Sequence, residues 1–205
     1  VQDIETSYLL NELKDNDVKN FVNDSMIQIK YMSKTLSDFR NFLKPSTKKV
    51  LFSISKALNE INEIIGKQVF YSNINMNFNY KNKNEELLIY GYENEFKQVL
   101  LNIINNAKNK IVEKNLPLNK KGEININIQR CENCNMIEII DDAGAIDEKI
   151  INSIFEPYFT TKENGMGLGL YMAKIIIEDK MKGTISVRND KNCVIFTIKL
   201  PFKKA

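Results

Sequence analysis

The sequence contains no histidine, no tryptophan and only three cysteines among its 205 residues. Three cysteines cannot form a full disulfide framework, and the C-x-x-C spacing of Cys131 and Cys134 would supply only half of a zinc site. Because the chain has no histidine and one other cysteine, we expect reduced thiols in a hairpin turn. A zinc half-site or a redox pair is the alternative that this spacing leaves open.

Long apolar runs and clustered basic residues are also missing. No stretch approaches the roughly 18 apolar residues that cross a membrane, no signal peptide is visible, and the net charge is only +3. We therefore expect no membrane contact by this fragment, no nucleic-acid binding and a cytoplasmic location. Because the sequence starts at Val1 rather than methionine, we expect a fragment of a longer parent, whose membrane attachment the sequence leaves open.

The first 45 residues carry an apolar pattern with heptad spacing. Its positions alternate four and three residues apart and include one polar member: Val18, Val22, Ser25, Ile29, Met32, Leu36, Phe39 and Leu43. A shorter stretch of the same type contains Val1, Ile4 and Tyr8. The pattern predicts a helical hairpin with a shortened first arm, which would complete an antiparallel bundle by dimerisation. An ordinary core helix is the alternative.

The stretch from Pro45 to Lys49 predicts a domain boundary, which gives domains 1–45 and 46–205. The second domain alternates between strand and helix patterns. We expect strands over 50–52, 69–80, 87–92, 123–130, 136–140, 183–188 and 193–200, and helices over 53–65 (stopped by Gly66), 93–113 and 147–154, with a further one after the glycines at 165–169. This order predicts an α+β fold, in which helices pack on one face of a mixed sheet.

The expected helix over 93–113 has a polar stripe opposite its apolar residues. At 100° per residue, Glu95, Asn102, Asn106 and Asn109 fall within about 60° of one another. Amide oxygens are neutral, hard ligands that can hold Mg2+ while phosphates supply the charge. The stripe therefore suits a bound ligand, and a solvated helix face is the alternative.

Two further features suit an adenine nucleotide. Asp141 ends an expected strand and is followed by small residues, so its carboxylate could accept hydrogen bonds from a donating ligand edge such as an amino group. Gly165, Gly167 and Gly169 precede an apolar helix pattern, where the backbone can approach an anion closely. Taken alone, the first feature is also typical of a turn aspartate, and the second of an ordinary glycine-rich loop.

Several stretches together resemble sensor histidine kinases. NEFKQVLLNIINNAKNKI resembles their N box, DDAGAI their G1 box, IFEPYFTTK their F box and GMGLGL their G2 box. SDFRNFLKP resembles the second helix of their dimerisation and phosphoacceptor domain. The resemblance covers nearly all of the chain. It implies a Bergerat-type ATP-binding fold, an α/β sandwich, joined to part of a helical hairpin.

The resemblance also assigns roles to individual residues, with ATP and Mg2+ as the cofactors. Asn106 would coordinate Mg2+, Asn102 would lie one turn before it on the ATP face, and both are the catalytic candidates. Asp141 would accept from the adenine amino group, and Phe155 and Phe159 would anchor a lid. The other implied ATP-binding positions are Asn109, Lys110, Ala143, Ala145, Ile146, Tyr158, Lys162, Gly165, Gly167, Leu168, Gly169 and Leu170.

The sequence departs from the family pattern at Ala143 and Ala145, where the G1 box usually has glycine. If either position needs a positive φ, alanine costs about 1–2 kcal/mol, and nucleotide affinity or turnover would suffer. The second departure is the missing histidine, because this family transfers the γ-phosphoryl group of ATP to a histidine. By the resemblance, that acceptor would precede Val1.

The implied function is therefore the ATP-binding catalytic portion of a protein-histidine kinase, with relay to a response regulator receiver domain and homodimerisation through the helical hairpin. The alternative is a non-catalytic dimerisation or docking module with a weakened nucleotide site. An ATP-hydrolysing relative such as a chaperone or topoisomerase is a weaker option. Such enzymes usually have a glutamate general base where this chain has Asn102.

Overall fold

The computed structural model describes residues 9, 14, 16–27, 29–30, 45–81, 85–114, 117, 120–162 and 165–201. Contacts divide the chain into two units, Val1–Phe42 and Leu43–Ala205. In the first unit, residues 16–27 and 29–30 are helical, and Val18, Val22 and Ile29 are exposed on this helix. The seam positions from Met32 onward and the predicted first arm lie outside the described residues.

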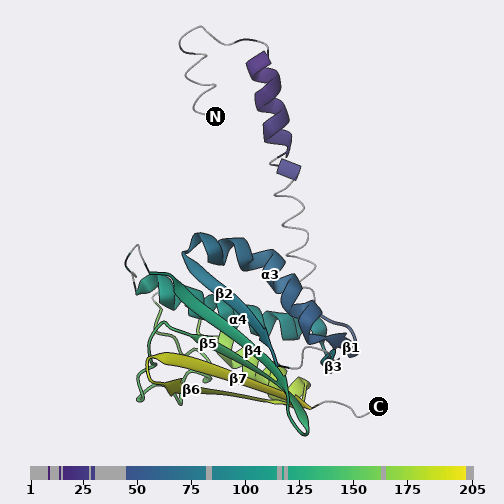
Figure 1. Ribbon diagram of the computed structural model, residues 1–205, viewed down its shortest axis with the longest axis vertical. Coiled ribbons are helices and arrows are strands. Elements are labelled where there is room, and N and C mark those ends of the chain that lie inside the picture. The colour runs from purple at the N-terminus through teal and green to yellow at the C-terminus, as the bar shows by residue number, and fades with distance from the viewer. Residues whose placement is uncertain are drawn as a thin grey trace. The chain divides into compact units, whose positions relative to one another are not determined.

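The second unit combines two sheets with helices. Its elements are β1 (Val50–Ser53), α3 (Ile54–Tyr71), β2 (Ile74–Tyr80), β3 (Leu88–Gly91), α4 (Glu93–Glu113), β4 (Gly122–Arg130), β5 (Cys134–Asp141), α5 (Gly169–Lys174), η1 (Ile175–Lys180), β6 (Thr184–Asp190) and β7 (Cys193–Pro201) (Figure 1). The larger sheet has the order β2-β4-β5-β7-β6 and is antiparallel except for the parallel β2–β4 pair. Strands β1 and β3 form a separate antiparallel pair. This mixed sheet with its helices confirms the predicted α+β class.

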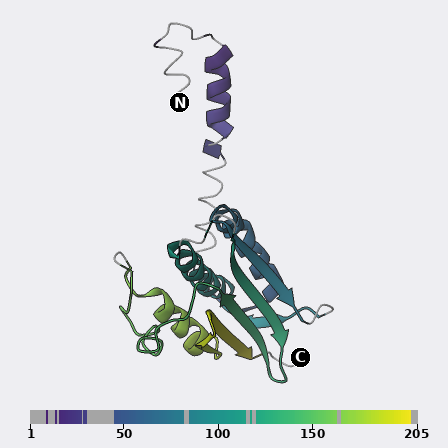
Figure 2. The ribbon, with the colours of Figure 1, turned by 60° about the vertical axis from the view of Figure 1, so that its left-hand side comes forward.

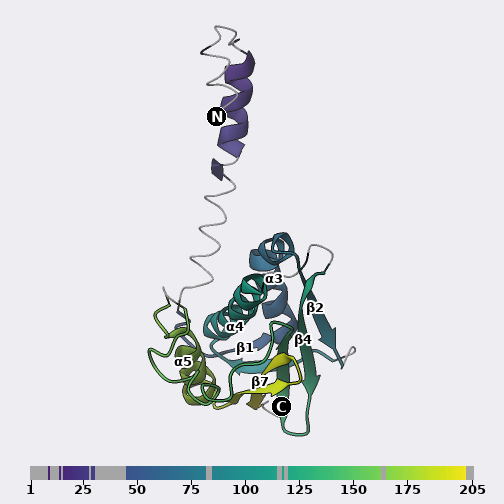
Figure 3. The same ribbon diagram turned by 90° about the vertical axis from the view of Figure 1, so that its left-hand side faces the viewer.

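Helices α3 and α4 lie side by side across one face of the larger sheet (Figures 2 and 3). Strands β4 and β5 place every second residue on this face, because side chains alternate along a strand. The fully buried side chains between the layers include Ile124, Ile126, Ile128, Ile137 and Ile139 from the sheet and Phe96, Leu100, Ile103 and Ile104 from α4. The alternation of isoleucine with polar residues thus fixes which face of the sheet is covered.

The other face of the larger sheet carries paired amides at its β2 edge. Asn77 donates to Asn125 at 3.1 Å and Asn79 donates to Asn127 at 3.0 Å, with each pair directly in register across the parallel strands. Cross-strand hydrogen bonds of this kind help to hold one register. Among the described residues, no helix is both long enough and apolar enough to span a bilayer.

The structure corrects two expected element limits. Gly66 does not end a helix, because α3 continues through it to Tyr71 and buries Val69, so the following strand begins at Ile74. Burial of Ile65 and Val69 in the core outweighs the local preference against glycine, which costs only about 1 kcal/mol in a helix. Residues 148–155 form successive turns instead of the expected short helix.

Candidate functional site

A cavity of about 550 Å3 opens in the second unit where α4 meets the end of β5, the turn that follows it, the F-box segment and the glycine turn. The predicted site residues converge on it from stretches that are far apart in the sequence. Those that line the cavity are Asn102, Asn106, Lys110, Asp141, Ala143, Ala145, Ile146, Lys162, Gly165, Gly167, Leu168, Gly169 and Leu170. The other two predicted positions, Asn109 and Tyr158, are exposed and do not line it.

Helix α4 supplies two amides to the cavity. The side-chain nitrogen of Asn102 is buried and has no hydrogen-bond partner among the described residues. A Cβ at Gly169 would lie only 2.5 Å from the Asn102 side-chain oxygen, so the absence of a side chain there lets the glycine turn pack directly on this amide. One turn later, the Asn106 side-chain oxygen accepts a hydrogen bond from Lys162 Nζ at 2.9 Å.

Asp141 ends β5 and is only 4% exposed. Burial raises the pKa of its carboxyl to about 6, and the neighbouring Asp142 adds to this rise. The backbone N–H of Ala143, which donates to Asp141 Oδ1 at 3.1 Å, and the charge of Lys114 oppose it. A buried carboxyl with a strongly perturbed pKa in a cavity is typical of a functional group.

The glycine turn is shaped by its protein neighbours. Gly167 has φ +65°, and a Cβ there would lie 2.4 Å from the backbone carbon of Tyr158. A Cβ at Gly165 would lie 2.5 Å from Thr160 Oγ1. The turn therefore packs against the F-box segment on one side and, through Gly169, against α4 on the other.

The two alanines that replace family glycines are not strained. Among the described residues, the non-glycine positions with positive φ are Asn73, Tyr158, Lys182 and Lys191, so neither Ala143 nor Ala145 belongs to them. The positive φ of this turn, +105°, falls on Gly144 between the two alanines. The free-energy cost of a positive φ, which the departure from the family pattern suggested for these two alanines, is therefore absent.

Sequence reasoning missed much of the apolar lining of the cavity. These residues come from the inner side of α4, the turns after Asp147, the glycine turn and β7: Ala107, Ile150, Ile154, Met166, Val194 and Phe196. The alternation of β7 places Val194 and Phe196 on one face, but only the sheet order brings that face to the cavity. Phe155, expected to anchor a lid, packs edge-on against Phe196 with ring centroids 6.4 Å apart.

Glu95 does not share the ligand-facing position that its place in the stripe suggested. It does not line the cavity and is 6% exposed, and its carboxylate accepts the backbone N–H of Ser46. The polar stripe of α4 thus divides into three parts, with Asn102 and Asn106 at the cavity, Glu95 at a contact with the segment before β1, and Asn109 exposed.

Comparisons with known proteins show which proteins the chain is similar to. Among curated proteins, sporulation kinase A of Bacillus subtilis is 30% identical over 82% of this chain and 27% of its own length. Sporulation kinase D of the same organism is 28% identical over 73% of this chain and 28% of its own. The chain therefore spans little more than a quarter of the length of these two relatives.

Solved structures of histidine kinases share the fold of this chain. The catalytic domain of histidine kinase ThkA, in a nucleotide-free form, is 28% identical and matches 76% of this chain and 96% of its own with a TM-score of 0.66. ThkA in complex with the response regulator protein TrrA, 22% identical, matches 97% of this chain and 56% of its own with a TM-score of 0.63 and supports the fold. Residues 91–204 match the family described as histidine kinase-, DNA gyrase B- and HSP90-like ATPases, and the chain belongs to this ATP-binding family.

Proposed function

We propose that this chain is the ATP-binding catalytic portion of a histidine kinase, which transfers the γ-phosphoryl group of ATP to a histidine outside the present sequence. The observation that carries the proposal is the convergence of Asp141, Asn102 and the glycine turn on one cavity. The similarity to sporulation kinase A and to the ThkA catalytic domain favours a kinase over the other branches of the family. The domain limits 1–45 and 46–205 and a cytoplasmic place of action belong to the same proposal.

Asp141 is the proposed acceptor for the adenine amino group. A carboxylate only accepts hydrogen bonds, and an exocyclic amino group only donates, so the two are complementary. With a pKa of about 6, most of the Asp141 population is ionised at pH 7. The apolar side chains of Ile150, Ile154 and Phe196 would surround a planar ring in the same cavity.

The buried nitrogen of Asn102 fits a nucleotide bound beside it. A buried donor without a partner costs free energy of about 1–3 kcal/mol, and an oxygen acceptor on a ligand would relieve that cost. Lys110 also lines the cavity and would lie close to bound phosphates. Gly165, Gly167 and Gly169 would bring backbone amides toward the same anion.

Asn106 is the proposed protein ligand for Mg2+. The described residues contain no cluster of three or more histidine, cysteine, aspartate or glutamate side chains that could hold a metal. A magnesium ion held by Asn106 would take most of its ligands from water and the phosphates. When bound, Mg2+ supplies neutralisation of the charge on the transferred phosphoryl group.

The proposed partners are a response regulator receiver domain and a second copy of the parent protein. ThkA, which shares the fold, forms a complex with a response regulator. Homodimerisation is proposed through residues 1–45, whose helix at 16–27 exposes Val18 and Val22. Because neither Ala143 nor Ala145 adopts a positive φ, the strain argument for a non-catalytic docking module is removed.

The proposal is tested in two steps. First, millimolar Mg-ATP is expected to raise the melting temperature of the chain, because a ligand that binds only the folded state stabilises it. Second, labelled phosphate is expected to pass from ATP to a separately supplied histidine-bearing hairpin and from there to a receiver domain. A melting temperature that ATP leaves unchanged would contradict the proposed nucleotide site. Nucleotide binding without phosphoryl transfer to the hairpin would favour the docking module.

A further inference from the structure

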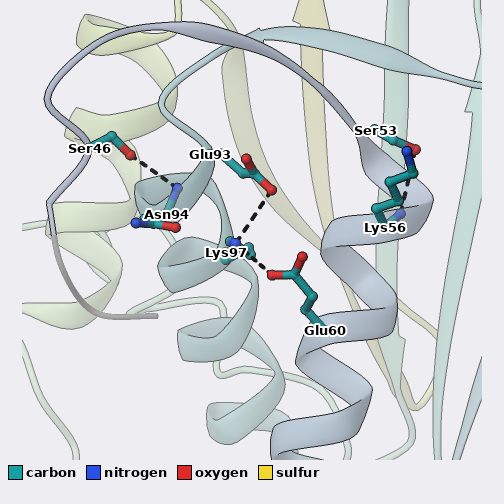
Figure 4. Close-up of polar contacts among 7 residues, drawn as sticks. All are labelled: Ser46, Ser53, Lys56, Glu60, Glu93, Asn94 and Lys97. Carbon is teal, nitrogen blue, oxygen red and sulfur yellow. Dashed lines mark hydrogen bonds and ion pairs between the residues drawn. The ribbon is translucent and has the colours of Figure 1, made fainter. Parts of the chain in front are cut away.

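The first turn of α4 is capped by a residue from a distant part of the chain. Its N-cap residue, Tyr92, makes no side-chain capping bond. Instead, Ser46 Oγ accepts the backbone N–H of Asn94 at 3.3 Å, across a separation of 48 residues (Figure 4). A side-chain oxygen that accepts an N–H of the first helical turn is the contact that an N-cap residue normally provides.

The same two segments are joined a second time in the opposite direction. The backbone N–H of Ser46 donates to both carboxylate oxygens of Glu95, at 3.2 and 3.4 Å. In a capping box, the cap hydroxyl accepts the N–H of the third helical residue while a Glu or Gln side chain at that position accepts the N–H of the cap residue. Glu95 is the third residue of α4 and Asn94 the second, so Ser46 and α4 form the same reciprocal pair from two separate segments, with the hydroxyl bonded one residue earlier. We call this pair a capping box.

Neighbouring contacts fix this end of α4 further. Lys97 is 5% exposed and contacts Glu60 of α3 at 2.7 Å and Glu93 at 3.4 Å (Figure 4). Lys49, three residues after Ser46, places its ammonium 5.5 Å from the centre of the Tyr92 ring. The segment that leads into β1 is therefore attached to the start of α4 by hydrogen bonds and by a cation–π contact.

The capping box and the cavity occupy the same face of one helix. Glu95 precedes Asn102 by seven residues, which is two turns or about 10 Å along the axis, and Asn106 follows one turn later. Because α4 is continuous and packed along its length, its first turn and its two amides belong to one rigid element. The contacts of the first turn therefore help to hold the helix that presents both amides to the cavity.

We infer that Ser46 and Glu95 are positioning residues that couple the segment entering the catalytic domain to nucleotide binding at Asn102 and Asn106. The inference rests on the proposed function. Docked Ser46 and bound nucleotide both stabilise the same arrangement of α4, so each favours the other. Such coupling is reciprocal: if bound nucleotide lowers the equilibrium constant for release of Ser46 by some factor, then the released state binds nucleotide more weakly by the same factor.

The test uses the full chain and two pairs of variants. Ser46→Ala removes the hydroxyl and has Thr47→Ala as its matched control, because Thr47 is the exposed hydroxyl next to it. Glu95→Ala removes the acceptor of the Ser46 N–H and has Glu63→Ala as its control, because Glu63 is an exposed carboxylate on α3. Two quantities are measured: hydrogen exchange of the Ser46 amide, and the Kd of a fluorescent ATP analogue with Mg2+.

Glu95→Ala is expected to accelerate exchange at Ser46, and Mg-ATP is expected to slow it in the unmodified chain. Ser46→Ala and Glu95→Ala are each expected to raise the Kd about fivefold, the lower end of typical couplings, while both controls stay within about twofold of the unmodified protein. Exchange at Ser46 that Glu95→Ala leaves unchanged would overturn the capping box. Normal nucleotide affinity in both capping-box variants would overturn the coupling alone, and an unmodified protein that binds no nucleotide would remove the proposed function together with it.

Discussion

Lys162 donates a hydrogen bond from its ammonium to the side-chain oxygen of Asn106, at 2.9 Å. This is the same oxygen that we propose as the protein ligand of Mg2+. This oxygen has two lone pairs, but an ammonium this close to it repels a divalent cation bound there. Metal binding at Asn106 is therefore expected to displace Lys162.

Replacement of Lys162 by methionine is expected to ease Mg2+ binding. The Lys162→Met variant should reach half-saturation of Mg2+-dependent nucleotide binding at about two- to fivefold lower Mg2+, because a partly exposed charge contact is worth up to about 1 kcal/mol. The measurement is a Mg2+ titration at fixed fluorescent nucleotide, with Lys67→Met on the exposed side of α3 as the control. A higher Mg2+ requirement in the variant would contradict this role and favour a direct contact of Lys162 with the phosphates.

The Asp141→Asn variant is expected to have a higher free energy of unfolding but a lower affinity for nucleotide. The folded-state pKa is raised to about 6 from the ordinary 3.8, so ionising this buried carboxyl at neutral pH opposes folding. By linkage the cost is about 3 kcal/mol at most, and the free energy of unfolding at pH 7 should rise in the variant. Nucleotide affinity should fall, because the amide would present a donor beside the adenine amino group. Urea unfolding and nucleotide titration measure the two effects, and a variant that is destabilised yet binds normally would refute both expectations.

Nucleotide affinity should depend on pH through the same carboxyl. As pH falls through about 6, Asp141 gains a proton and is lost as a full acceptor, so affinity should decline below that pH. Stability should change in the opposite sense, because a raised folded-state pKa means that the native chain binds the proton more tightly. The free energy of unfolding contributed by this group should therefore decrease as pH rises from about 4 to 6. In the Asp141→Asn variant, the pH dependence of nucleotide affinity should reflect only the titration of the nucleotide phosphates. A series of nucleotide titrations at different pH on both proteins measures this difference.

Gly167→Ala tests the close packing of the glycine turn. A Cβ at this position meets the Tyr158 backbone at 2.4 Å, and φ is +65°, so the substitution combines a clash with backbone strain of about 1–2 kcal/mol. Gly144→Ala is the matched comparison, because its φ is also positive while the nearest atom to a Cβ there, on Asn192, lies 4.0 Å away. We expect Gly167→Ala to lower the melting temperature more than Gly144→Ala and to weaken nucleotide binding. Equal effects of the two variants would show that strain alone, and not the contact with the F-box segment, decides the outcome.

The elements that the sequence predicts well are those with long, regular patterns. The α4 helix appears over the expected residues, and Asp141 ends its strand as expected, because isoleucine alternation and the spacing of the α4 core residues are local signals. The predicted end of α3 at Gly66 was wrong, because the burial of Val69 in the core outweighs the low helix propensity of glycine. Helix periodicity alone assigned Glu95 to the ligand face. Its hydrogen-bond partner, Ser46, lies 49 residues away, and the periodic pattern of the helix contains no information about such a contact. The β7 contribution to the cavity likewise depends on strand order, which no local pattern contains.

The parallel pairing of β2 with β4 has a consequence for biosynthesis. Ribosomes deliver β2 first, yet its partner emerges only after β3 and all of α4 have been made. Until then the nascent chain holds an unpaired strand whose apolar residues include Ile74, Met76 and Phe78, and closing so long a connection is entropically slow. The amide-rich outward face of β2 keeps that waiting strand polar on one side, which would limit its association with other unfinished chains on the same message.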